Sequence, residues 1–137
     1  MKIALHDADK TKLPKLALLK LAAYHKARGD SVEWHMPLAN YDVIYSSKVF
    51  TWTPESRYLP AGAQLGGTGY GLMANLPEEV EHTCPDYDFG RINFSMGFLT
   101  RGCPRNCPWC IVPVKEGPIR AHADIEEFAR HRDVVLM

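Results

Sequence analysis

The chain has 137 residues, long enough for one domain with a hydrophobic core and short for two. Its 46% hydrophobic and 23% charged residues are typical of a soluble globular protein, and 16 basic residues balance 16 acidic ones. The balance gives no indication of binding to nucleic acid or to an anionic membrane, because both usually require a basic excess. No apolar run approaches the roughly 20 residues of a membrane span, and Asp7 comes too early for a secretory signal. We therefore expect a cytoplasmic protein, in which clustered cysteines hold metal or do redox chemistry rather than form disulfides.

The first part of the chain alternates strand and helix patterns. Residues 2–5 predict a buried strand that leads into the polar loop His6-Asp7-Ala8-Asp9. Apolar residues with helical spacing predict a helix over 13–28, with its lysines on the polar side and Gly29 as its C-terminal stop. Residues 32–35 and 41–46 predict two further strands. This order indicates a small α/β layer with parallel pairing across the helix.

The region from 50 to 85 is rich in proline and glycine, which predicts irregular structure. Gly66-Gly67-Thr68-Gly69-Tyr70-Gly71 lacks the Lys-Ser/Thr ending of a nucleotide-triphosphate loop and the spacing of a dinucleotide fingerprint. We interpret it as a turn that lets the backbone approach another group closely. The polar residues that follow, among which Cys84 is expected to be half-buried, indicate a solvated loop: His82, Cys84, Asp86 and Asp88.

The last part of the chain again alternates strand and helix. Residues 92–99 predict a strand that runs directly into the cysteine-rich loop, residues 111–114 an extended segment, and residues 123–130 a short helix. Residues 133–137 predict a final strand, and because 134–137 are all apolar it is expected to be a parallel strand buried on both faces. A chain that ends on such a strand is expected to be the front part of a longer polypeptide.

Three of the four cysteines fall within eight residues, as Cys103-x3-Cys107-x2-Cys110. Thiolates are soft ligands suited to zinc or iron–sulfur clusters. A closed zinc site would need a fourth ligand such as Cys84 or His82, and zinc modules usually show two paired C-x2-C knuckles where this chain has one. A ferredoxin-type carrier would need a nearby fourth cysteine, and none follows Cys110. The pattern favours a four-iron cluster with one iron open to a small molecule.

This spacing, with the aromatic Trp109 just before the last cysteine, resembles the cluster motif of the radical S-adenosylmethionine (radical SAM) superfamily. The resemblance implies that Cys103, Cys107 and Cys110 hold a four-iron, four-sulfur ([4Fe–4S]) cluster whose fourth iron binds the amino and carboxylate groups of S-adenosylmethionine. It implies reductive cleavage to a 5′-deoxyadenosyl radical, with Trp109 packed near the adenine. The resemblance also implies an electron donor such as flavodoxin or ferredoxin as a partner. It does not indicate which substrate the radical would attack.

The resemblance also implies a domain organisation. Residues 1–90 resemble the small Rossmann-like, cobalamin-binding-type domain that precedes the catalytic barrel in many members, and residues 91–137 the first βαβ part of a truncated, partial TIM-type barrel. The Asp-x-His-x-x-Gly stretch of histidine-ligated cobalamin binding does not occur, so cobalamin is not expected. The glycine-rich segment that follows the second barrel strand in the family is also absent, so this chain alone is expected to be inactive. A non-catalytic zinc- or cluster-binding module is the alternative.

Overall fold

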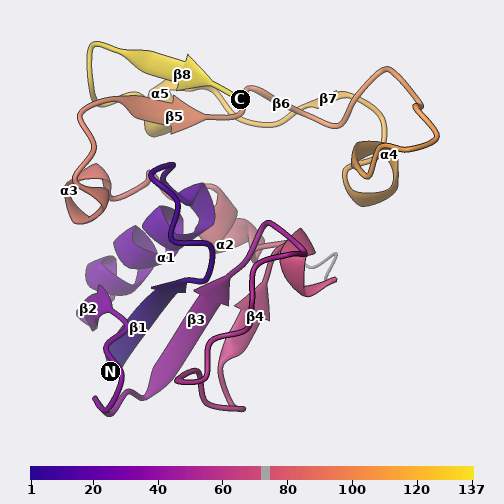
Figure 1. The fold of residues 1–137 in the computed structure, drawn as a ribbon. Helices are drawn as coiled ribbons and strands as arrows, with labels where there is room; N and C mark the ends of the chain where they lie inside the picture. The colour runs from indigo at the N-terminus through magenta and orange to yellow at the C-terminus, as the bar shows by residue number, and fades with distance from the viewer. Residues whose placement is uncertain (72–74) are drawn as a thin grey trace. The chain divides into compact units, whose positions relative to one another are not determined.

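The computed structural model describes residues 1–71 and 75–137, which divide into two units between Arg91 and Ile92. The first unit is built on a parallel sheet of four strands: β1 (Lys2–Asp7), β2 (Ser31–Trp34), β3 (Val43–Ser47) and β4 (Gln64–Gly66). Their order in space is β2-β1-β3-β4 (Figure 1). β1 therefore lies in the interior of the sheet, which explains its continuous apolar sequence. The α/β class and the parallel pairing predicted from the sequence are confirmed.

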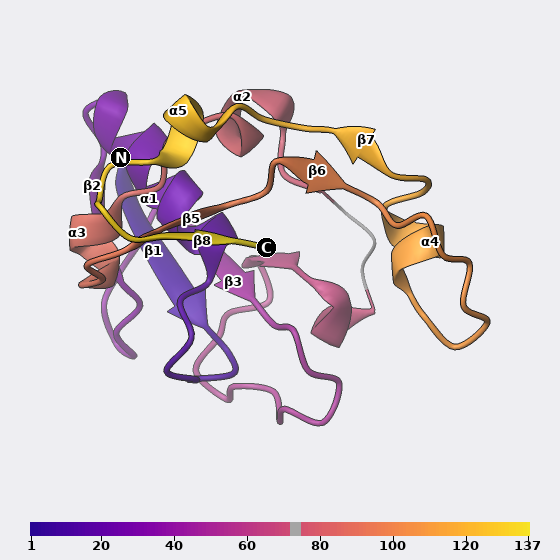
Figure 2. The same ribbon diagram turned by 90° about the horizontal axis from the view of Figure 1, so that it is seen from above.

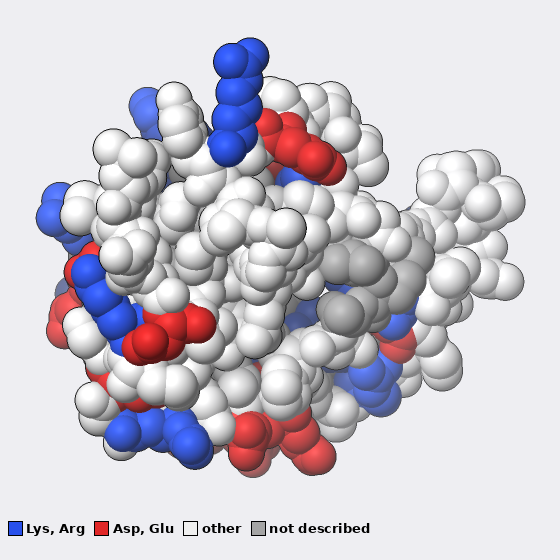
Figure 3. All heavy atoms as spheres, turned by 90° about the horizontal axis from the view of Figure 1, so that it is seen from below, with Lys and Arg blue, Asp and Glu red and all other residues white. Residues whose placement is uncertain are grey.

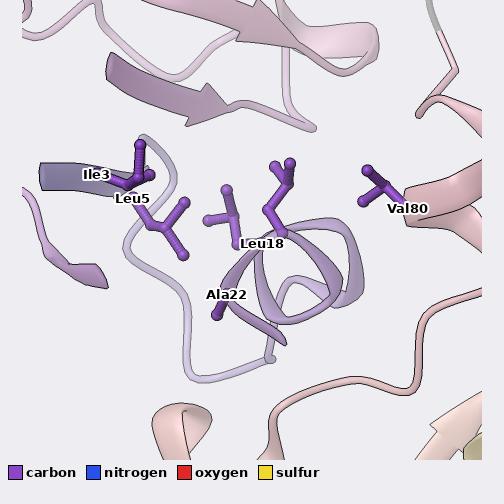
Figure 4. Close-up of a cluster of buried hydrophobic side chains, with 6 residues drawn as sticks. Ile3, Leu5, Leu18, Ala22 and Val80 are labelled. Atoms are coloured by element: carbon purple, nitrogen blue, oxygen red, sulfur yellow. The ribbon is translucent and has the colours of Figure 1, made fainter. Parts of the chain in front are cut away.

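Helix α1 (Leu16–Ala27) supplies half of the buried core cluster of this unit, namely Leu18, Leu21 and Ala22. Leu18 and Ala22 on α1 meet Ile3 and Leu5 on β1, and Val80 on α2 (Glu78–Glu81) joins them (Figure 4). All five side chains are buried, none more than 3% exposed. Because side chains alternate along a strand, the odd-numbered residues of β1 face the helix and the even-numbered ones face the other side of the sheet.

Two details of the helix prediction were wrong. Leu13 falls within the predicted helix as one of its apolar residues, but it lies before α1 and is 73% exposed. Lys20 was assigned to the polar side, but it is 5% exposed, and its ammonium group lies 2.9 Å from Glu81 Oε1 and also contacts Glu81 O. Lys20 is buried because α2 packs on a second face of α1. The periodicity of the α1 sequence gives no sign of this contact.

The region from 50 to 85 is more ordered than its composition predicted. It contains β4, the 3₁₀ turn η1 (Thr68–Tyr70) and α2, and α3 (Tyr87–Gly90) follows it. Residues 72–74, which belong to the region predicted to be irregular, lie outside the described residues. Asp86 caps α3 by accepting a hydrogen bond from Phe89 N at 2.9 Å and pairs with Lys26 at 2.7 Å. This part of the expected solvated loop therefore has a structural role.

The second unit pairs β5 (Ser95–Gly97) with β8 (Val134–Leu136) in parallel, connected through α5 (Ile125–Phe128). Phe128 is buried against Gly97, where an added Cβ would lie 2.5 Å from the ring. Ser95 Oγ is fully buried and accepts hydrogen bonds from Arg130 N and His131 N. β5 and α5 are both shorter than the strand predicted over 92–99 and the helix predicted over 123–130.

The strand β8 differs from its prediction in burial. Its parallel pairing with β5 is confirmed, but Val135, Leu136 and Met137 are 44–53% exposed rather than buried on both faces. Among the described residues, none of the helices is long and apolar enough to span a membrane. Acidic and basic side chains are interspersed over the face in Figure 3, in keeping with the zero formal net charge.

Candidate metal centre

The three clustered cysteines lie on a loop whose two ends are joined by a short antiparallel ladder. β6 (Thr100–Arg101) pairs with β7 (Arg120–Ala121), with Thr100 opposite Ala121 and Arg101 opposite Arg120 (Figure 2). Backbone hydrogen bonds extend this base on both sides: His122 N donates to Leu99 O at 2.9 Å, and Cys103 N to Gly117 O at 3.3 Å. Residues 102–119 therefore form a closed loop that begins one residue before the first cysteine.

Gly102 makes the close approach of the two loop ends possible. Its φ of +82° lies in the left-handed region, and a Cβ there would fall onto the Pro118 carbonyl oxygen and within 2.7 Å of Gly117 O. Both obstacles are backbone atoms, which cannot move aside as the end of a side chain can. The glycine is thus required by space as well as by conformation.

Replacing Gly102 by alanine is expected to open the loop. Strain of this kind costs of order 1–3 kcal/mol, so cleavage of the native protein by trypsin at the exposed Arg105 should accelerate by roughly tenfold or more. Gly62→Ala is the matched control, because nothing lies within 4 Å of a Cβ at that position. Equal cleavage rates for Gly102→Ala and the wild type would show that the loop is not held closed at Gly102.

A charged contact accompanies the backbone closure. Arg101 Nη1 lies 3.3 Å from Glu116 Oε1, and its guanidinium lies 4.0 Å from the centre of the Phe98 ring. The Arg101 and Glu116 side chains are 21% and 16% exposed, so this ion pair is partly shielded from water. Arg101 therefore has a defined partner within the loop.

Cys103, Cys107 and Cys110 are all half-buried on this loop. Cys103 Sγ accepts a hydrogen bond from Arg105 N at 3.4 Å, and Cys110 N donates to Cys107 O at 3.1 Å, which makes a tight turn between the second and third cysteines. All four cysteines of the chain lie in its described part, and none forms a disulfide. Within residues 1–71 and 75–137, no three His, Cys, Asp or Glu side chains converge closely enough to hold a metal ion. The structure thus places the three cysteines on one loop without bringing their thiols together.

The residues around the cysteines differ in part from the prediction. Trp109 is 86% exposed at the turn before Cys110. Residues 111–114 were expected to be extended, but α4 (Val112–Lys115) is a helical turn, with Val114 N and Lys115 N both donating to Ile111 O. Pro113 occupies the first turn of this short helix, a position at which proline is tolerated because no hydrogen bond is lost there.

The polar residues at 82–88, which include the two weighed as a fourth metal ligand (Cys84 and His82), lie in the first unit. Cys84 is half-buried, as expected, and its Sγ lies 3.8 Å from Pro85 O. His82 is exposed at the C-terminal end of α2. Asp86 takes part in the cap of α3 and the pair with Lys26, while Asp88 is exposed. Asp86 therefore serves the packing of its own unit.

A second polar cluster lies at the carboxyl end of the four-stranded sheet. His6 Nδ1 and Ser46 Oγ are 2.8 Å apart, and Ser46 Oγ lies 2.8 Å from Tyr70 OH. Burial lowers the pKa of His6, and the neighbouring His35 lowers it further.

The glycine loop that carries Tyr70 packs on the backbone of residue 48: Gly69 N donates a hydrogen bond to Lys48 O at 2.9 Å. A Cβ on Gly69 would come within 2.8 Å of Phe50 O, so the close backbone approach expected for this loop is to the chain itself.

Sequence reasoning missed the most strongly held carboxylate of the first unit. Asp9, expected on an exposed loop, has a side chain only 1% exposed. It accepts hydrogen bonds from Val49 N at 2.7 Å, Phe50 N at 3.3 Å and Thr53 Oγ1 at 2.6 Å, and it pairs with Lys15 at 2.9 Å. Burial raises its pKa, but these hydrogen bonds outweigh burial and hold the pKa well below the ordinary value of an aspartate. Partners some 40 residues away leave no local signal in the sequence.

Comparisons with protein-family models, with curated proteins and with solved structures found no match to this chain.

Proposed function

We propose that Cys103, Cys107 and Cys110 hold a [4Fe–4S] cluster and that the chain carries the cluster-binding part of a radical SAM enzyme. The observation that carries the proposal is the C-x3-C-x2-C spacing on a single loop. The ends of this loop are joined by the β6–β7 ladder and by the backbone hydrogen bonds beside it. Three soft thiol donors, half-buried and outside any disulfide, fit an iron–sulfur cluster better than a hard cation. With three protein ligands for four irons, one coordination position remains for a small molecule.

The loop's own residues supply binding and placement. Deprotonated Cys103, Cys107 and Cys110 bind iron, and Gly102 and the β6–β7 base fix the point at which the first of them enters. The exposed Trp109 offers an aromatic face beside the third ligand, suited to packing against an adenine ring. When bound, the cluster supplies the electron that cleaves the sulfonium of S-adenosylmethionine into methionine and a 5′-deoxyadenosyl radical. The substrate-positioning residues of such an enzyme would come from further barrel strands.

The two units support the same proposal in different degrees. A parallel sheet of order β2-β1-β3-β4 is compatible with a small Rossmann-like domain. In the second unit, β5, α5 and β8 form one strand–helix–parallel strand connection, the repeating unit of a TIM-type barrel, with the cysteine loop after its first strand. Active sites of such barrels gather at the carboxyl ends of the strands, which is where this loop begins. We further propose that the protein works in the reducing cytoplasm and that a flavodoxin or ferredoxin is its electron donor.

Anaerobic reconstitution of the 137-residue chain with iron and sulfide tests the proposal. We expect a brown protein that contains about four iron and four sulfide per chain. Metal analysis of protein purified without reconstitution provides the comparison with a zinc module. One tightly held zinc per chain and no retained sulfide would contradict the proposed function and favour the non-catalytic zinc-binding alternative.

A further inference from the structure

Two arginines face each other where the cysteine loop leaves its base. Arg101 on β6 and Arg120 on β7 are directly opposite in the antiparallel register. Like charges at directly opposed positions of a strand pair repel and weaken the pairing. The ladder is only two residues long on each strand, so it has few other contacts to oppose that repulsion. A group that offsets these two charges therefore decides whether the loop stays closed.

Glu116 is that group, because it contacts both arginines. Its carboxylate oxygen Oε1 lies 3.3 Å from Arg101 Nη1, and its backbone carbonyl oxygen accepts a hydrogen bond from Arg120 Nη1. The guanidinium of Arg101 also lies over the Phe98 ring, 4.0 Å from its centre. Since the Arg101 and Glu116 side chains are largely shielded, water and salt screen their attraction less than at an open surface.

The same contact lies next to the first cysteine. Gly117, the residue after Glu116, accepts the backbone hydrogen bond from Cys103 N. Arg101 and Cys103 are separated only by Gly102, which approaches Pro118 and Gly117 so closely that no Cβ would fit between the loop ends. When Glu116 holds Arg101, it therefore also fixes the position from which the Cys103 side chain departs.

We propose that Glu116 is the positioning residue of the cysteine loop: it holds Arg101 and Arg120 together so that Cys103 is presented to the metal from a closed loop. This inference rests on the proposed function of the three cysteines. A loop with its ends already joined loses less conformational entropy when three of its side chains bind one centre. Glu116 thus contributes to cluster retention without being a ligand.

The substitution Glu116→Gln removes the negative charge of this side chain and keeps its shape. In the metal-free 137-residue protein, we expect hydrogen exchange at the Cys103 and His122 amides to accelerate by about threefold to fivefold, the effect of losing one partly shielded ion pair. In the reconstituted protein, iron loss to a chelator should accelerate by a similar factor of about five. Glu126→Gln is the control, because it removes the same charge from an exposed position of the same unit and should change neither rate.

The swap R101E/E116R completes the test. It returns opposite charges to the two positions and removes the like-charge pair across β6 and β7, so we expect it to restore both rates to near the wild-type values. Unchanged exchange at Cys103 in Glu116→Gln would overturn the inference, and so would faster exchange with an unchanged rate of iron loss. If the wild type itself retains no iron, the proposed function fails, and the exchange rates alone then decide whether Glu116 closes the loop.

Discussion

Replacing Cys103, Cys107 or Cys110 by alanine is expected to abolish retention of the cluster, with iron per chain falling from about four to near zero in each variant. Each substitution removes one of three thiolate ligands, and the remaining two leave a second iron without a protein donor. The loss should be nearly complete in all three variants because no other cysteine lies on the loop between residues 102 and 119. Iron and sulfide analysis after anaerobic reconstitution measures the effect.

Cys84→Ala is the matched control for this series. Cys84 lies in the first unit and is half-buried beside Pro85, so its removal should leave iron and sulfide at the wild-type level. A loss of metal in Cys84→Ala equal to that in Cys103→Ala would identify Cys84 as a fourth ligand. A site closed by four cysteines has no position for S-adenosylmethionine, and the proposed chemistry would then be wrong.

The second large effect is expected at Asp9. Asp9→Ala leaves the Lys15 ammonium and the Val49 amide without their buried acceptor, so the first unit should lose about 3 kcal/mol of its free energy of unfolding. With an m-value of about 1 kcal/mol/M for a unit of this size, the urea midpoint should fall by about 3 M. Far-UV circular dichroism measures the transition. Asp88→Asn changes an exposed carboxylate of the same unit and should shift the midpoint little.

Asp9 also predicts how stability depends on pH. Its pKa in the folded protein lies below the value of about 3.9 in the unfolded chain, so the unfolded state takes up a proton first as the pH falls. The contribution of Asp9 is therefore fully present above about pH 4 and is lost progressively below it. The difference in urea midpoint between the wild type and Asp9→Asn should shrink between pH 5 and about pH 2.5. A difference that stays constant over this range would show that the carboxylate is not held ionised by the fold.

The sequence predicted the parts of the fold that depend on local pattern. The apolar run at 2–5 became the interior strand β1, and helical spacing located α1 within three residues at its start and one at its end. The parallel order followed from the strand–helix–strand succession. These features are set by neighbours in the chain, so composition and periodicity were enough.

The features that the sequence did not predict depend on distant partners. Lys20 is buried because Glu81, 61 residues away, pairs with it. The carboxylate of Asp9 can be buried because the backbone amides of residues 49 and 50 donate hydrogen bonds to it. Within the candidate site, the cysteine spacing was enough to propose the donors, but the role proposed for Glu116 depends on the register that brings Arg101 opposite Arg120. Three of residues 111–114 carry β-branched side chains that favour extended structure, yet a helical turn begins at Val112, with Pro113 in it.

The most direct test of the central claim is electron paramagnetic resonance of the reduced, reconstituted protein with and without S-adenosylmethionine. If three cysteines bind a four-iron cluster and leave one iron open, adding S-adenosylmethionine should shift the g-values of the reduced cluster, because its amino and carboxylate groups bind that iron. Methionine, S-adenosylhomocysteine and buffer serve as comparisons at the same concentration. A reduced-cluster spectrum that S-adenosylmethionine leaves unchanged would contradict the open coordination site on which the proposed function depends.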